Sequence, residues 1–286
     1  MYDFEFGSRT AKGGFANEKA ICEKFNNWKN DEDAKLWLKI MGYDPDKIDY
    51  VKAIQIPIRI KKSDIRKFGF SEEEYEELMR FKKTDVQVQI RLVIRINNAL
   101  KVENLSLKKA NFNFCYNQVD KRWVDSYKEM WHFDDEIALA LKLFTGEIPP
   151  SSHREMLKVS ISQLRDQRRV FLTELRDDIV EKIISFFTQN KILVVSDILK
   201  GRGGFAADWM LVTIYNKDED TTIWILKDIN TVMNFFGQGD VRVSPKGSLY
   251  IGRITMQRKS GTPDPTKLQF KISPCDLLKL QQDGEQ

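Results

Sequence analysis

The stretch from Lys82 to Lys109 constrains the fold of this chain more than any other segment. Its apolar and polar residues alternate, which predicts two adjacent strands at residues 85–96 and 102–108, because successive side chains of a strand point to opposite faces. Asn97 and Asn98 lie between the two strands and suit a tight hairpin turn. The segment is therefore expected to form a hairpin within a larger sheet.

Polar residues of this hairpin suggest a metal-dependent phosphodiesterase centre. Asp85 opens the first strand, and Ser106 and Lys108 share a face near the end of the second. Metal-dependent cleavage of a phosphodiester uses carboxylates that hold the ion and a cation near the scissile phosphate, and Mg²⁺ needs only one or two acids because it keeps several waters. Glu18, on a helix predicted over residues 15–28, is a second carboxylate. An Asp that opens a strand and a Lys that ends one are also ordinary turn and edge residues, and the spacing alone does not separate the two interpretations.

Two further acids are weaker candidates. Glu103 lies three residues before Ser106, so a regular strand directs it to the opposite face. Asp208 opens a later strand whose neighbour carries Lys227, but Ile225 stands two residues before that lysine. The pattern favours a structural or base-contacting role for Asp208 over a metal site.

The order of elements predicts an α/β fold (α+β mixed), with a central mixed β-sheet flanked by helices and a β-rich C-terminal region. At 286 residues and 42% hydrophobic composition the chain is long enough for two domains. Pro149 to Ser152 is the best linker, which predicts a division into residues 1–148, with the candidate phosphodiesterase residues, and the β-rich residues 149–286. Helices are predicted at 32–42, 71–83, 113–131, 134–146 and 168–189, and strands at 52–62, 192–199, 208–215, 221–229, 239–245, 247–259 and 267–274.

Basic residues gather in one segment although the formal net charge is only +4. Between Arg242 and Lys271 there are seven Lys or Arg and one acid, a distribution that favours contact with a polyanion. Arginine and amide side chains read base edges, so Gln257 and Arg258 are the preferred base contacts, whereas lysines mainly meet phosphates. A solvated loop is the alternative interpretation. The residues predicted to contact DNA are Arg202, Lys246, Arg253, Gln257, Arg258, Lys259 and Lys267.

Cysteine usage and the N-terminus indicate a cytoplasmic protein. Cys22, Cys115 and Cys275 are odd in number and widely spaced, which predicts reduced core thiols and argues against a zinc site. The first residues contain no apolar signal region, and no uncharged apolar run is long enough to cross a membrane.

Two sets of residues resemble known nucleases. Glu18, then Thr84-Asp85-Val86, then Ser106-Leu107-Lys108-Lys109, in this order, resemble the active-site layout of the PD-(D/E)XK nuclease superfamily. The run IGRITMQRKSGT followed by KLQFKISP resembles a segment shared by several type II restriction endonucleases. The resemblance implies a restriction-endonuclease-like fold in which Asp85 and Glu18 hold Mg²⁺ and Lys108 acts at the attacked phosphate. Ser106 stands where the superfamily has an acid and would orient a water, and Thr84 stands where it has Pro.

The sequence thus predicts a type II restriction endonuclease, which hydrolyses double-stranded DNA at a specific sequence with Mg²⁺ as cofactor. A companion DNA methyltransferase of the same specificity is implied by the class. Because Ser106 replaces an acid, a catalytically degenerate nuclease-fold DNA-binding protein is an alternative, as is a structure-selective DNA repair nuclease. No residue pattern identifies a dimer face.

Overall fold

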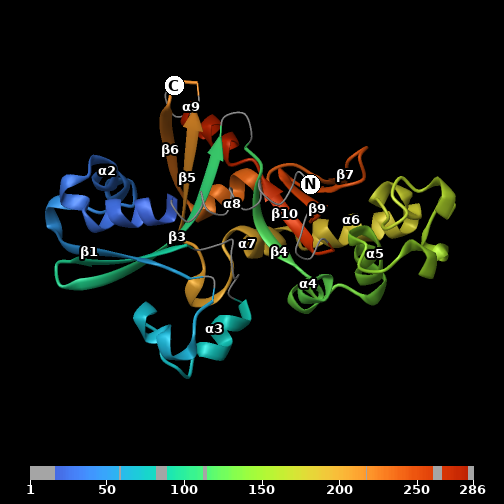
Figure 1. The fold of residues 1–286 in the computed structure, drawn as a ribbon, viewed down its shortest axis with the longest axis horizontal. Coiled ribbons are helices and arrows are strands. Elements are labelled where there is room, and N and C mark those ends of the chain that lie inside the picture. Colours follow the sequence, from blue (N-terminus) through green and yellow to red (C-terminus); the bar gives the residue numbers. More distant parts are fainter. Residues whose placement is uncertain are drawn as a thin grey trace. The chain divides into compact units, whose positions relative to one another are not determined.

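The computed structural model describes residues 17–57, 59–81, 89–111, 115–216, 218–259 and 266–282 (Figure 1). The chain divides into two compact units, each built from segments that are distant in sequence. Unit 1 comprises Met1–Asn117, Leu199–Val232 and Ser273–Gln286, and unit 2 comprises Gln118–Ile198 and Met233–Ile272. These units describe packing, so the functional division into residues 1–148 and 149–286 stays a prediction.

Unit 1 is organised around a mixed five-stranded sheet with the order β1-β2-β3-β5-β6. All neighbours run antiparallel except β3 and β5, which are parallel and pair Leu105 with Trp209 and Lys108 with Val212. The predicted central mixed sheet is therefore confirmed (Figure 1). The strands are β1 (Ile48–Gln55), β2 (Ile90–Ile96), β3 (Ala99–Asn111), β5 (Trp209–Asn216) and β6 (Thr221–Asp228).

The predicted hairpin is formed by β2 and β3. Ile96 pairs with Ala99, and Asn97 and Asn98 between them have φ angles of 48° and 64°. Asparagine tolerates this left-handed region better than most residues, which confirms the predicted turn. β3 is longer than expected at 13 residues. The predicted beginning of the first strand, residues 85–88, lies outside the described residues.

Helices of unit 1 supply apolar side chains to the core of this sheet. Residues 17–26 are helical, and α2 (Glu32–Ile40) follows with the Asp31 side chain accepting a hydrogen bond from the Ala34 amide. Phe25 and Trp37 join one buried cluster with strand residues such as Leu92. The helix predicted over residues 32–42 is confirmed. It ends at Ile40, and Gly42, with a φ of 86°, follows this end as expected.

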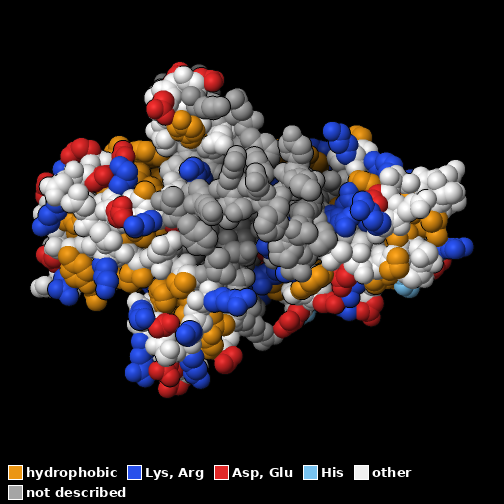
Figure 2. Space-filling view, in the orientation of Figure 1, with side chains coloured by type: hydrophobic (Ala, Val, Ile, Leu, Met, Phe, Trp, Pro, Cys, Tyr) orange, Lys and Arg blue, Asp and Glu red, His pale blue; other side chains and the backbone are white. Residues whose placement is uncertain are grey.

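A smaller apolar cluster holds the segment between β1 and β2. The 3-10 helix Lys62–Phe68 and α3 (Tyr75–Phe81) pack together around Ile65. Ser71 and Glu74 make the predicted reciprocal capping bonds, at 2.7 and 3.4 Å. Figure 2 shows acidic and basic side chains intermixed over the part of unit 1 that contains α3. The strand predicted at 52–62 is displaced, since β1 starts at Ile48 and ends at Gln55, before Pro57.

Unit 2 contains a second sheet of five strands, with the order β4-β10-β9-β8-β7. Its four C-terminal strands confirm the predicted strand-rich C-terminal part, and α5 ends at Gly146 as expected. Nowhere in the described part of the chain is a helix long and apolar enough to span a membrane. The strands are β4 (Asn117–Arg122), β7 (Val241–Val243), β8 (Leu249–Ile251), β9 (Ile254–Arg258) and β10 (Leu268–Ile272), and the remaining helices are α4 (Val124–Trp131), α5 (Asp135–Thr145), α6 (Asp177–Gln189), α7 (Lys191–Leu199), α8 (Ile229–Gly237) and α9 (Lys279–Gln282).

Three secondary-structure predictions are wrong. Residues 117–122 form β4 instead of the start of a helix, because they pair into the sheet of unit 2. Residues 192–199 lie in α7 instead of a strand, and their buried members Val194, Val195, Ile198 and Leu199 repeat at helical spacing. The helix predicted from 168 begins only at Asp177.

The cysteines also depart from expectation. Cys115 and Cys275 form a disulfide with a Cα–Cα distance of 6.0 Å, so the prediction of reduced thiols is wrong for this pair. Cys22 is free and buried, and burial raises the pKa of its thiol to about 12. The two cysteines are 160 residues apart in the sequence, so no short cysteine motif indicates that they pair.

Candidate active site and DNA-contacting residues

Lys108 lies near the buried end of β3, the middle strand of the unit 1 sheet. Its exposed fraction is 4%, and that of Ser106, on the same face by strand alternation, is 1%. Leu107 between them belongs to the hydrophobic core. Burying an ammonium group is unfavourable unless other groups compensate its charge. The position of Lys108 therefore has to be explained by its electrostatic partners.

Glu18 is one of these partners. It lies on the helix of residues 17–26, and its Oε2 accepts a hydrogen bond of 2.7 Å from Nε2 of Gln55, on β1. Burial raises the pKa of the Glu18 carboxyl, while the bond from Gln55 and the charge of Lys108 lower it. The structure therefore brings Glu18 and Lys108 close together, as the sequence predicted. Asp85, the third member of the predicted site, lies outside the described residues.

Gln89 is a residue of this site that the sequence analysis missed. It directly precedes β2, and its Oε1 accepts a hydrogen bond of 2.6 Å from the Leu107 amide, between Ser106 and Lys108. The backbone amide of Gln89 donates a hydrogen bond of 3.0 Å to the Leu105 carbonyl. Gln89 thus fixes the backbone that carries Ser106 and Lys108. Gln55 was missed as well, and for both residues the available signal was an amide side chain inside a predicted strand.

The two weaker acids have structural partners. Glu103 accepts hydrogen bonds from Nε1 of Trp209, at 3.0 Å, and from the Tyr43 hydroxyl. Oδ2 of Asp208 accepts a bond of 2.8 Å from the Asn104 amide. Burial raises the pKa of Asp208, against the lowering effect of that bond and of nearby positive charges. These contacts support the structural role predicted for Asp208.

A buried arginine completes the network around Asp208. Arg91 is 7% exposed, and its Nη1 donates to Oδ1 of Asn104 and to the Gly204 carbonyl, both at 3.0 Å. Nδ2 of Asn104 also donates to the Gly204 carbonyl, at 3.1 Å. The network joins the hairpin to the segment that leads into β5, so it holds the strand of Lys108 against its parallel neighbour.

The donor set beside Lys108 suits a hard cation. Within the ranges that the structure describes, no three His, Cys, Asp or Glu residues are grouped to hold a metal ion. Mg²⁺ nevertheless needs only one or two carboxylates from the protein and prefers oxygen ligands. The carboxylate of Glu18 is such a ligand, so the described residues are compatible with Mg²⁺ and supply part of its coordination.

Four of the predicted DNA-contacting residues lie together at the end of the β9–β10 pair. Gln257 and Arg258 are the last residues of β9, and Lys259 follows with its amide donating to the Lys267 carbonyl at 2.8 Å. The ammonium group of Lys267 lies 5.2 Å from the ring centroid of Trp123. Gln257 and Arg258 therefore lie within the β9–β10 pairing of unit 2, and Lys259 lies just beyond the end of β9.

The other three are distributed. Arg253 lies in the turn between β8 and β9, with its guanidinium 4.0 Å from the Phe235 ring centroid. Lys246 is exposed in the turn between β7 and β8. Arg202 belongs to unit 1, directly before the 3-10 turn Gly203–Phe205. The seven residues therefore do not form one cluster.

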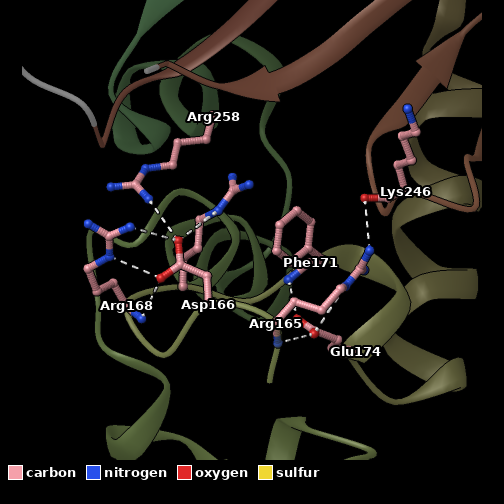
Figure 3. A network of polar contacts seen from close by, with 8 residues as sticks. Arg165, Asp166, Arg168, Phe171, Glu174, Lys246 and Arg258 are labelled. Carbon is pink, nitrogen blue, oxygen red and sulfur yellow. Dashed lines mark hydrogen bonds and ion pairs between the residues drawn. The ribbon is translucent and has the colours of Figure 1, made fainter. Parts of the chain in front are cut away.

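Arg258 has a partner that its sequence neighbours do not indicate. Its Nη1 lies 3.8 Å from Oδ2 of Asp166, an acid in a loop that also contains Arg165, Arg168 and Arg169 (Figure 3). Neither this loop nor Asp166 was singled out from the sequence. They lie far from Arg258 in the sequence, so no local pattern links them to it.

The mixed sheet flanked by helices places the chain in the restriction-endonuclease-like fold class. Among solved structures, restriction endonuclease MspI in complex with its cognate DNA resembles this chain, with a TM-score of 0.55 at 13% sequence identity over 89% of this chain and 87% of that chain. None of the curated proteins matches the chain.

The family follows from the sequence itself. Residues 75–278, well over half of the chain, match the model of the R.HinP1I restriction endonuclease family, and the chain belongs to that family. It is therefore a type II restriction endonuclease, an enzyme that cleaves DNA at specific sites, as the C-terminal motif indicated.

Proposed function

We propose that this enzyme hydrolyses double-stranded DNA at a specific sequence with Mg²⁺ as its cofactor. The observation that supports this best is the pairing of a buried lysine, Lys108, with the half-buried carboxylate of Glu18. An acid and a cation held together in a nearly dry site can act on a phosphate without reorganising water.

The residues have distinct roles in this proposal. Glu18 and Asp85 would hold Mg²⁺, which would supply charge neutralisation at the phosphate and activation of the attacking water. Lys108 stabilises the charge that develops on the scissile phosphate, and Ser106 orients the attacking water. Gln55 keeps Glu18 in place through its hydrogen bond of 2.7 Å.

Recognition is assigned to unit 2 and to one loop of unit 1. Gln257 and Arg258 are proposed as base contacts, because amide and guanidinium groups donate bidentately to base edges. Arg202, Lys246, Arg253, Lys259 and Lys267 are proposed as contacts to phosphates and groove edges. In this scheme residues 1–148 carry the catalytic groups and residues 149–286 carry the groups that contact DNA.

Plasmid cleavage in Mg²⁺ tests the site. Lys108→Ala, Glu18→Ala and Asp85→Ala are each expected to lose cleavage while they still bind cleavable DNA in Ca²⁺. The matched control is Lys109→Ala, since Lys109 is the next residue of β3 but is exposed. Undiminished cleavage by Lys108→Ala would contradict the assignment, as would a loss of cleavage in the control. Addition of EDTA should stop cleavage by the wild-type enzyme.

Family membership favours this proposal over the two alternatives. A degenerate DNA-binding protein would retard plasmid DNA without cutting it, and a repair nuclease would cut branched DNA and spare ordinary plasmid. Sequencing the ends of the products gives the recognition site and the stagger together. A DNA methyltransferase that modifies the same sequence in the cytoplasm is the proposed functional companion.

A further inference from the structure

Three guanidinium groups in unit 2 share one carboxylate. Nε and Nη2 of Arg168 donate to the two oxygens of Asp166 at 3.0 and 3.3 Å. Nε of Arg169 lies 3.7 Å from Oδ2 of Asp166, and Nη1 of Arg258 lies 3.8 Å from the same oxygen. We call Asp166, Arg168, Arg169 and Arg258 the Asp166 cluster (Figure 3).

The Asp166 cluster contains three arginines and one aspartate. The adjoining Arg165 is paired with Glu174 at 3.3 Å. Like charges repel, and the charge of Arg258 adds to the effect of burial in lowering the pKa of Arg169. A second anion at the cluster would relieve this repulsion.

The loop that presents these arginines is held in place. The guanidinium groups of Arg165 and Arg169 lie 4.1 and 4.2 Å from the ring centroid of Phe171. The carboxylate of Glu174 accepts hydrogen bonds from the amides of Arg165 and Phe171, at 2.9 and 2.8 Å. Arg168 is nevertheless 81% exposed. An anion that binds here meets groups that are already ordered, so little conformational entropy is lost.

The cluster is continuous with the proposed base-reading residues. Arg258 is the last residue of β9 and follows Gln257 directly, so the Asp166 loop adjoins the strand that is assigned to base contacts. We propose that the Asp166 cluster binds a backbone phosphate of the DNA through Arg168 and Arg169. This inference rests on the proposed function, because it presumes that β9 faces DNA.

Salt dependence of binding distinguishes a phosphate contact from a structural role. Binding of a short mixed-sequence duplex is measured in EDTA over a range of salt concentrations. Arg168→Gln and Arg169→Gln are each expected to weaken binding and to reduce the slope of log K against log salt by about 1, the value for one lost phosphate contact. Arg168→Lys keeps the charge and is expected to restore the slope.

Arg176→Gln is the matched control. Arg176 forms an ion pair with Asp178 at the same spacing of two residues, on the same unit but outside the cluster. It is expected to leave the slope unchanged. Arg169 is only 17% exposed, so Arg169→Gln could disturb the fold. Its binding data are used only if the variant unfolds cooperatively on heating. If it does not, the test rests on the exposed Arg168 alone.

Each outcome has a separate meaning. If the wild type binds the duplex and Arg168→Gln keeps the wild-type slope, the phosphate contact is refuted while the proposed function stands. If Arg176→Gln lowers the slope equally, the effect is one of general charge, and the site is refuted as well. If the wild type itself does not bind DNA, the proposed function fails, and this inference fails with it.

Discussion

Lys108 is a buried cation, and the surrounding residues explain how a strand can carry it. The charge of Lys108 favours the ionised form of Glu18, and Gln89 accepts a hydrogen bond from the backbone next to Lys108. Lys108 is only 4% exposed, so little water screens its ammonium group and its electrostatic interactions are strong.

Gln89 is expected to act as a positioning residue. Gln89→Ala removes the acceptor of the Leu107 amide and should lower kcat by roughly 10–100-fold, as losses in groups that support reactive side chains typically do. KM should change little, because Gln89 bonds to the enzyme's own backbone. Steady-state kinetics on plasmid DNA measure both values. A rise in KM at constant kcat would instead indicate that Gln89 contacts the substrate.

Asp208 is expected to make stability depend on pH. Burial raises its pKa in the folded state above the unfolded value, so the folded state holds the proton more tightly. Its contribution to stability is present below the unfolded pKa and is lost as pH rises through the raised folded pKa. Asn resembles the protonated form, so the stability of Asp208→Asn relative to the wild type should increase with pH. Urea unfolding at several pH values measures this difference, and a constant difference would contradict it.

At the scale of elements, the hairpin β2–β3 depends on the segment that precedes β5. The Gly204 carbonyl accepts hydrogen bonds from both Arg91 and Asn104, so one glycine peptide receives donors from both strands. Apolar side chains lie against the Cα of Gly204. A Cβ at Gly204 would lie 2.4 Å from Cε1 of Phe70 and 2.9 Å from Cδ2 of Leu78.

Gly204→Ala is therefore expected to destabilise the fold by roughly 1–3 kcal/mol, the usual cost of overpacking. Gly237→Ala is the control, because a Cβ there would meet Val195 at an ordinary 3.6 Å and the backbone needs no positive φ. Urea unfolding compares the two variants. Equal stabilities would mean that Phe70 moves aside without cost.

The hairpin and its turn could be predicted because their signals are local. Asn97-Asn98 between two alternating runs specifies a turn and a register without reference to the rest of the chain. Residues 192–199 were wrongly predicted as a strand because their local pattern is ambiguous. A run of Ile, Leu and Val fits a buried helix as well as a strand. β4 was missed because its conformation is set by pairing within the unit 2 sheet.

The site was predictable in part for the same reason. Glu18 and Lys108 stood out through their types and their order along the chain, whereas the amides of Gln55 and Gln89 are common in strands. The contact between Asp166 and Arg258 joins distant segments through side chains alone. No spacing in one sequence encodes such a contact.

At the scale of the molecule, the disulfide closes a long loop. Cys115 and Cys275 belong to unit 1 but lie 160 positions apart, so the bond restricts the unfolded chain strongly. Reduction, or Cys275→Ser, is expected to lower the free energy of unfolding by roughly 2–4 kcal/mol. Thermal unfolding with and without reductant measures this effect. Cys22→Ala is the control, because its own stability change should be the same under both conditions.

The parallel pairing of β3 with β5 also has a consequence for synthesis. All of Gln118–Ile198 lies between the two strands, so the ribosome completes most of unit 2 before β5 emerges. At elongation rates of about 5–20 residues per second, the strand that carries Lys108 waits roughly 5–20 s for its neighbour. During that interval Lys108 lacks the sheet that buries it. A chain that ends before β5 therefore lacks one of the two strands that flank β3 in the finished sheet.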